Sequence, residues 1–271
     1  MRRALFVMSV AALAPASACV GDAGGQTVDF VVAAAGPADA VGGQPLAFSQ
    51  SGWDIVLSRA TLHVGAVYLI QTKPVSGGQA TGCFLTNAGE YVAQETGTSP
   101  AGTAPGLDVD LLSPAPQPFP EMGHGVTFPS ALIGQVWLVH GDINVAADLV
   151  PMLVVEGTAA KDGVSFPFTG SFTIGTNHQK VGALAGGDPI CKERIISGIS
   201  PVPAVQTTGG LLLRIDPRSL FNFDFDDRAT SAPTAPYRFN DSPASWDTAS
   251  SDLYMALTST APYSFSWVAD L

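Results

Sequence analysis

Basic residues are scarce in this sequence. Its 271 residues include 12 Lys and Arg against 23 Asp and Glu, which gives a formal net charge of −11. A surface of that sign repels phosphate backbones, so the composition argues against nucleic-acid binding. Charged residues make up only 13% of the chain, while Gly and Pro contribute 29 and 21 residues. Little charge and frequent turn residues are typical of exported β proteins rather than helical ones.

The local motifs of several enzyme classes are also missing. The chain has no G-x-S-x-G nucleophile elbow, no H-E-x-x-H zinc helix, no phosphate-binding P-loop and no C-x-x-C pair. Gly123-His124-Gly125 begins like a dinucleotide-binding fingerprint, but Phe128 stands where the third Gly belongs. Catalytic serines and carboxylates can still be assembled by folding rather than by spacing. A secreted hydrolase or glycan-active protein is therefore retained as a hypothesis, ranked behind a binding function and a metal-binding function.

No apolar run reaches the length of about eighteen residues that a helix needs to span a bilayer. At the N-terminus, Arg2 and Arg3 precede an apolar run of eleven uncharged, mostly apolar residues at positions 4–14. That stretch has the length of a signal-peptide core and is too short for a membrane span. Small residues at 16–18 follow, and then Cys19. This order of features predicts export.

The small residues that end at Cys19 resemble the lipobox of bacterial lipoproteins, with Ala16 standing where Leu is usual. The resemblance implies that the signal peptide, residues 1–18, is removed and that the Cys19 thiol carries lipid. Several acyl chains together hold a protein firmly, so the membrane is an expected partner. Val20, rather than Asp, follows the cysteine, which favours the outer membrane, on its periplasmic or cell-surface side. The alternative is an ordinary secretory peptide cut near Ala18.

The number of cysteines fits lipidation. Three is an awkward number for an exported protein, because one thiol is left over when two form a disulfide. Lipid on Cys19 leaves Cys83 and Cys191 as a pair that an oxidising compartment would join. Closing so long a loop stabilises the fold by about 4–5 kcal/mol in the chain-entropy treatment. Two separate buried thiols are the alternative.

The mature chain predicts a single all-β domain at 27–271, joined to the lipid by a short polar tether at 19–26. Runs rich in β-branched and aromatic residues recur between Gly- and Pro-rich breaks, without alternation of strands and helices. This pattern favours an antiparallel β-sandwich with one or two short helices near the C-terminus. The expected strands cover 27–34, 53–70, 133–145, 152–159, 164–174, 194–199, 211–215 and 263–268.

The longest of these runs carries a change of phase. Residues 53–57 are apolar at odd positions and residues 62–70 at even ones. Strand side chains alternate between faces, so the buried face must change sides near 58–61, and a bulge is expected there. On this interpretation His63 points away from the core.

Turn and cap residues predict the connections. Asp162-Gly163 between two β-rich runs predicts a hairpin. Asp216-Pro217 predicts the start of a short helix, and residues 245–257 predict a second one. Residues 97–120, rich in Pro and Gly, are expected to form a long loop.

Histidine and methionine raise a metal hypothesis. Imidazole nitrogen and thioether sulfur are ligands that copper accepts, and a sandwich can bring distant strands to one ion. The hypothesis requires at least three ligands within about 5 Å of one point, because coordination bonds near 2 Å leave little slack. Surface or structural histidines are the alternative. The candidate ligands are His63, Met122, His124 and His140.

An acidic run makes calcium a weaker candidate. The side chains concerned are those of Asp224, Asp226 and Asp227. The EF-hand pattern fails, because Asp227 stands at the sixth position, where Gly is needed. A solvated acidic turn with Phe223 and Phe225 in the core explains the composition better.

The sequence thus predicts a membrane-anchored exported lipoprotein that acts as a non-enzymatic binding or structural module, with an unidentified protein or small-molecule partner. A metal-binding lipoprotein, with copper as the preferred ion, is the first alternative. The hydrolase or glycan-active protein is the second. Aromatic residues grouped on one open surface would mark a binding patch, and the residues to inspect are Trp53, Trp137, Tyr237 and Trp246.

Overall fold

The computed structural model describes residues 25–70, 106–127, 133–145, 147–178, 190–225 and 236–271, and of residues 91–95 the backbone alone. Across these segments the strands form one sheet of nine strands and one of six. Helical structure is limited to short pieces and one longer helix near the C-terminus. The predicted all-β sandwich with a short C-terminal helix is confirmed.

The larger sheet is mixed. Most neighbouring strands run antiparallel, but its N-terminal strand pairs in parallel with a strand from the last quarter of the chain, in a register from Val31 opposite Gly210 to Ala35 opposite Arg214. In spatial order the strands are β12 (Ile195–Ile199), β9 (Ile133–Trp137), β4 (Ala66–Ile70), β5 (Tyr91–Glu95), β8 (Gly123–Val126), β1 (Thr27–Ala35), β13 (Gly210–Ile215) and β15 (Tyr263–Val268), with β7 (Gln117–Pro118) also beside β1.

The smaller sheet contains the predicted hairpin. Lys161 lies opposite Val164, and the turn between them uses Asp162 at φ 52° and Gly163 at φ 80°, as a tight hairpin turn requires. In spatial order the strands are β14 (Tyr237–Arg238), β11 (Val164–Phe172), β10 (Leu153–Lys161), β3 (Trp53–Val64) and β2 (Leu46–Gln50), with β6 (Leu107–Asp110) also beside β3.

The predicted bulge in β3 is confirmed. Leu57 lies opposite Gly157 and Arg59 lies opposite Glu156, so Ser58 has no partner residue on β10. The extra residue reverses the alternation, because successive side chains on a strand point to opposite faces. Buried apolar residues at odd positions before it and at even positions after it therefore reach the same core, and they are Trp53, Ile55, Leu57, Leu62 and Val64.

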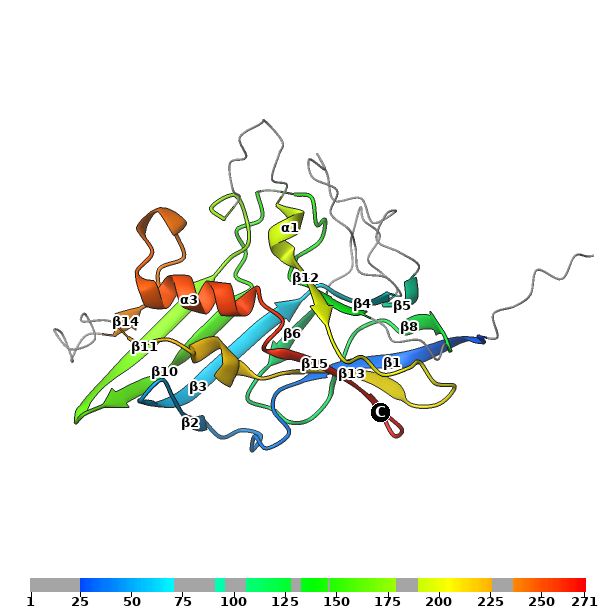
Figure 1. Ribbon diagram of the computed structural model, residues 1–271, viewed down its shortest axis with the longest axis horizontal. Coiled ribbons are helices and arrows are strands. Elements are labelled where there is room, and N and C mark those ends of the chain that lie inside the picture. The colour runs from blue at the N-terminus through cyan, green and yellow to red at the C-terminus, as the bar shows by residue number, and fades with distance from the viewer. Residues whose placement is uncertain are drawn as a thin grey trace, which may run out of the picture.

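The core lies between the sheets and extends under the C-terminal helix. One cluster of buried residues joins β1, β3, β10, β11 and β13 to the helix. In Figure 1 the long strands β3, β10 and β11 run side by side at one end of the molecule, and β1, β13 and β15 at the other. The helical elements are α1 (Cys191–Arg194), η2 (Pro217–Phe221), η3 (Pro243–Ser245) and α3 (Thr248–Leu257), and Asp216 caps η2 by accepting a bond from the Arg218 N–H.

Two expectations about the connections need correction. The segment 97–120 is not wholly a loop, because it contains β6, which pairs with β3, and the two-residue β7, which pairs with β1. The strand expected at 133–145 ends at Trp137. Short strands beside longer ones are held by backbone bonds, and one of them includes Pro118, so their composition resembles that of a loop.

Candidate functional site

The structure brings together two of the four predicted metal ligands. The rings of His63, at the end of β3, and His140, which follows β9, are stacked with their centroids 3.5 Å apart and their planes at 23°. Nδ1 of His63 lies 2.7 Å from Oδ1 of Asp108, and Nε2 of His140 lies 3.3 Å from the carbonyl oxygen of Pro151. Imidazole lone pairs lie in the ring plane, so stacked rings do not direct them at a common point.

The expectation that His63 points away from the core is confirmed, but the side chain is not exposed. It lies on the face of β3 opposite Leu62 and Val64, but it is only 4% exposed because His140 covers it. Its Nε2 makes no hydrogen bond of good geometry to a described residue, and a Cβ at Gly106 would approach that atom to 2.6 Å. Burial lowers the pKa of the His63 imidazole, which Asp108 opposes and His140 reinforces. The pair is a tightly packed contact, in which burial disfavours a charge on His63.

The other two predicted ligands lie apart from this pair. His124, on β8, places Nδ1 2.6 Å from Oδ1 of Asp29 on β1, with its side chain 54% exposed. Met122 precedes β8 and is 47% exposed. Within the described segments, no three or more His, Cys, Asp or Glu side chains gather where they could hold a metal ion. The three histidines of the predicted copper site are therefore not gathered into one group.

The fourth histidine forms a second buried cluster. Nε2 of His178 lies 2.9 Å from Oδ1 of Asp241, and the imidazole stacks on Tyr254 at 4.2 Å with the planes at 4°. Three side-chain atoms here have no hydrogen-bond partner among the described residues: Nδ1 of His178, Nε1 of Trp246 and the hydroxyl oxygen of Tyr254. An Asp–His pair that served a serine or cysteine nucleophile would present its second nitrogen to that group. No described side chain occupies that position, which leaves the hydrolase hypothesis without a nucleophile here.

The described residues that were proposed for a calcium site and for an aromatic binding patch have other contacts. Asp224 accepts a bond of 2.6 Å from Nε1 of Trp53 and lies 3.3 Å from Nζ of Lys161, so its carboxylate is already paired. Phe223 and Phe225 are buried, as predicted. Asp226 and Asp227 lie outside the described residues. Of the four aromatic residues proposed to mark a binding patch, Trp53, Trp137 and Tyr237 are buried, and Trp246 is partly buried in the His178 cluster.

Of the three cysteines, Cys191 lies within the described residues. Cys191, at the start of α1, is fully buried and disulfide-bonded. Cys19 and Cys83 lie outside the described residues. Lipidation of Cys19 and the pairing of Cys83 with Cys191 therefore remain predictions.

A hollow of about 400 Å³ opens beyond the C-terminal ends of β1 and β13. Because these two strands are parallel, the segments that follow them emerge at the same edge of the sheet, which is where ligand crevices commonly form beside parallel strands. Its lining comes from residues 37–39 after β1, from Arg214, Asp216 and Arg218 at and beyond the end of β13, and from Ser264 on β15.

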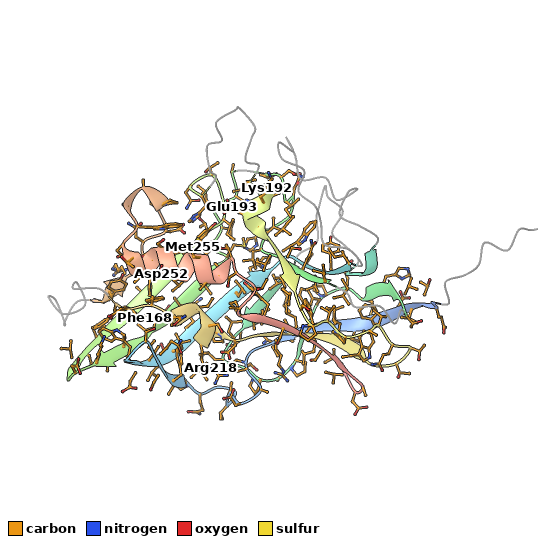
Figure 2. The ribbon with its side chains drawn as sticks, in the orientation of Figure 1. Phe168, Lys192, Glu193, Arg218, Asp252 and Met255 are labelled. Carbon is orange, nitrogen blue, oxygen red and sulfur yellow. The ribbon has the colours of Figure 1, made fainter. Side chains whose placement is uncertain are left out.

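Arg218 holds two carboxylates at the wall of this hollow. Its Nη1 and Nη2 donate to both oxygens of Asp39 at 2.8 and 3.0 Å, while Nε and Nη2 donate to Asp216 at 2.8–3.1 Å. The hydrogen bonds that the guanidinium donates to Asp216 and, next in size, to Asp39 raise its pKa, and the bond to Asp39 lowers the pKa of that carboxyl. Arg218 lies on the opposite side of the molecule from Lys192 and Glu193 of α1 (Figure 2).

Arg214 is the one basic residue of the lining that is not neutralised by a described acid. Its Nη1 donates to the carbonyl oxygen of Gly36 at 2.9 Å and lies 3.5 Å from that of Pro114, and none of the ion pairs between described residues includes it. The side chain is half-buried. A guanidinium has five N–H donors, so most of those of Arg214 are available to an anion in the hollow.

Sequence reasoning identified Asp216 only as a helix cap and did not identify Arg214, Arg218 or Asp39. The missing information was the pairing of β1 with β13, whose partner residues are about 180 positions apart in the chain. A weaker signal was present, because Asp39 and Asp216 each follow an apolar run that was expected to be a strand. Without the parallel register, nothing in the pattern links the two.

No helix within the described segments combines the length and apolar character needed to cross a membrane. Comparison of the chain with protein-family models, with curated proteins and with solved structures finds no match in any of the three.

Proposed function

We propose that this protein is an exported lipoprotein, held on the outer membrane by lipid on Cys19, whose β-sandwich is a non-enzymatic binding module. The hollow beyond the C-terminal ends of β1 and β13 is its ligand site. The observation that carries the binding proposal is the half-buried Arg214, which faces a hollow of about 400 Å³ without an acidic partner among the described residues. That volume is at the lower end of the range for small-molecule sites.

Anchoring is supported by the signal-peptide pattern and by the position of the first strand. Thr27 begins β1 eight residues after Cys19, and β1 starts at one end of the molecule (Figure 1). A lipid at Cys19 would therefore tether the sandwich by its end and leave its faces open. The proposed disulfide between Cys83 and Cys191 would strengthen the mature fold.

The binding reading is preferred to its two alternatives on geometric grounds. Copper binding is disfavoured because the stacked rings of His63 and His140 gain no third ligand within the described residues. Hydrolysis is disfavoured because His178 and Asp241 have no described nucleophile beside them. The hollow, in contrast, combines a cavity with the guanidinium of Arg214, which forms no ion pair with another described residue.

Labelling of cells with an alkyne fatty acid tests the anchor. We expect the full-length protein to incorporate the label and to fractionate with outer membranes, and the Cys19→Ser variant to lose both properties. An unlabelled protein with a free thiol at Cys19 would refute the anchor. Peptide mapping without reduction tests the disulfide, which predicts a linked pair of peptides containing Cys83 and Cys191.

A further inference from the structure

The hollow presents its polar groups in a row that the strand register fixes. Arg214 lies directly opposite Ala35 on β1 and directly opposite Ser264 on β15. Residues directly opposite each other in a sheet project from the same face. The side chains of Arg214 and Ser264 therefore project from the same face of the sheet, and both residues line the hollow.

Arg214 is suited to a carboxylate. Its unused N–H donors form a planar fork that matches the two oxygens of a carboxylate, and the neighbouring hydroxyl of Ser264 can add a third bond. The carbonyls of Gly36 and Pro114 fix the guanidinium by its Nη1, so little freedom is lost when an anion binds.

Arg218 cannot perform the same role, because Asp39 and Asp216 occupy its donors. Its effect is to hold those two carboxylates at the wall of the hollow. An ionised carboxylate has about four acceptor positions, so Asp39, with one bond to each oxygen, retains capacity for a further donor. The hollow therefore combines one available cation with a fixed pair of anions.

We infer that the hollow binds a small zwitterion of the amino-acid type, with its carboxylate on Arg214 and Ser264 and its ammonium group against Asp39 and Asp216. This inference rests on the proposed binding function and names its ligand class. A ligand with one charge of each sign satisfies both halves of the lining. A phosphate dianion would bring a second negative charge toward Asp39 and Asp216 in a chain that is already acidic.

Calorimetric titration of the mature, lipid-bearing protein in detergent tests the inference. The probes are L-alanine, propionate, ethylamine and inorganic phosphate. We expect L-alanine to bind at least tenfold more tightly than any of the other three, because each of them lacks one of the two charges or carries the wrong one. Arg214→Gln should weaken L-alanine binding at least tenfold. Arg59→Gln, which alters an exposed pair with Glu156 on β10, is the matched control and should bind as the unaltered protein does.

Arg214 also contacts the backbone, so a second variant protects the test against misfolding. Asp39→Asn, at an exposed side chain, should weaken L-alanine binding severalfold and leave propionate binding unchanged or stronger. Failure of L-alanine to bind the folded protein, equal binding of propionate or phosphate, or equal losses in the Arg214 and Arg59 variants would overturn the inference. Fatty-acid labelling separates the two proposals: a labelled protein that binds no probe refutes the ligand, and an unlabelled protein that binds L-alanine refutes the anchor.

Discussion

The two buried histidines, His63 and His178, have different surroundings. His63 and His178 each place one ring nitrogen on a carboxylate and leave the other without a hydrogen-bond partner. The carboxylate of Asp108, beside His63, is 72% exposed, whereas that of Asp241, beside His178, is 25% exposed. His63 stacks on another titratable ring, His140, and His178 stacks on Tyr254.

The difference lies in how many groups depend on each carboxylate. Asp241 also accepts bonds from the backbone N–H and hydroxyl of Thr173, at 3.0 and 2.7 Å, and from the side chain of Asn177, at 2.9 Å. It therefore joins β11 and the segment after it to the residues that lead into α3. Asp108 serves His63 at an exposed position. The Asp241–His178 site is a structural centre, whereas the Asp108–His63 pair is a contact that protonation can alter.

The largest expected effect follows from removing the shared carboxylate. Asp241→Ala leaves the donors of Thr173, Asn177 and His178 unpaired in a mostly buried site, and should lower the free energy of unfolding by about 3 kcal/mol. Asp108→Ala should lower it by less than about 1 kcal/mol at neutral pH, because that carboxylate is largely solvated. Urea unfolding of both variants measures the difference. Equal losses would remove the distinction between the two sites.

The next effect concerns acid. Burial lowers the pKa of His63 in the folded protein, so the unfolded chain binds the proton first as the pH falls through the ordinary imidazole range near 6.5. Stability is therefore complete above that range and declines as the pH is lowered through it. Denaturant unfolding at pH 7.5 and at pH 5.5 should show this decline, and His63→Phe should make the slope shallower while keeping a ring against His140. An unchanged slope in His63→Phe would show that this pair is not the acid-sensitive contact.

The smallest effect concerns an unpaired hydroxyl in the His178 cluster. The hydroxyl of Tyr254 is buried without a hydrogen-bond partner, and burial raises its pKa. Tyr254→Phe removes that polar atom and retains the ring that stacks on His178, so stability should be unchanged or rise by up to about 1 kcal/mol. Thermal unfolding is sufficient to detect the sign. A loss of more than about 1 kcal/mol would mean that the hydroxyl has a partner, such as an ordered water.

The parts of the fold that the sequence predicted are those with strong local signals. The Asp162-Gly163 hairpin, the bulge at Ser58 and the cap at Asp216 each depend on a few neighbouring residues with one preferred geometry. Strands such as β6, β7 and β14 have four residues or fewer and pair beside longer strands. Their composition is that of loops, so a single sequence does not distinguish them.

The candidate sites show the same limit. Residue type alone drew attention to His63 and His140, and the structure places them in contact, but as stacked rings. Residue type gave no reason to select Arg214. Nothing in the neighbouring sequence indicates that the acidic residues of the hollow, Asp39 and Asp216, pair with Arg218 instead. That property emerges only from the register that places β13 beside β1.

The parallel pairing of β1 with β13 also affects the order in which strand contacts form during folding. Val31 cannot meet Gly210 until residues up to Gly210 have been delivered, so loop closure makes this contact slow and late compared with the β10–β11 hairpin. A polypeptide that is threaded across a membrane benefits from such a delay, since premature folding would block its passage. On the proposal that this chain is exported, the hollow would take shape only after its passage across the membrane.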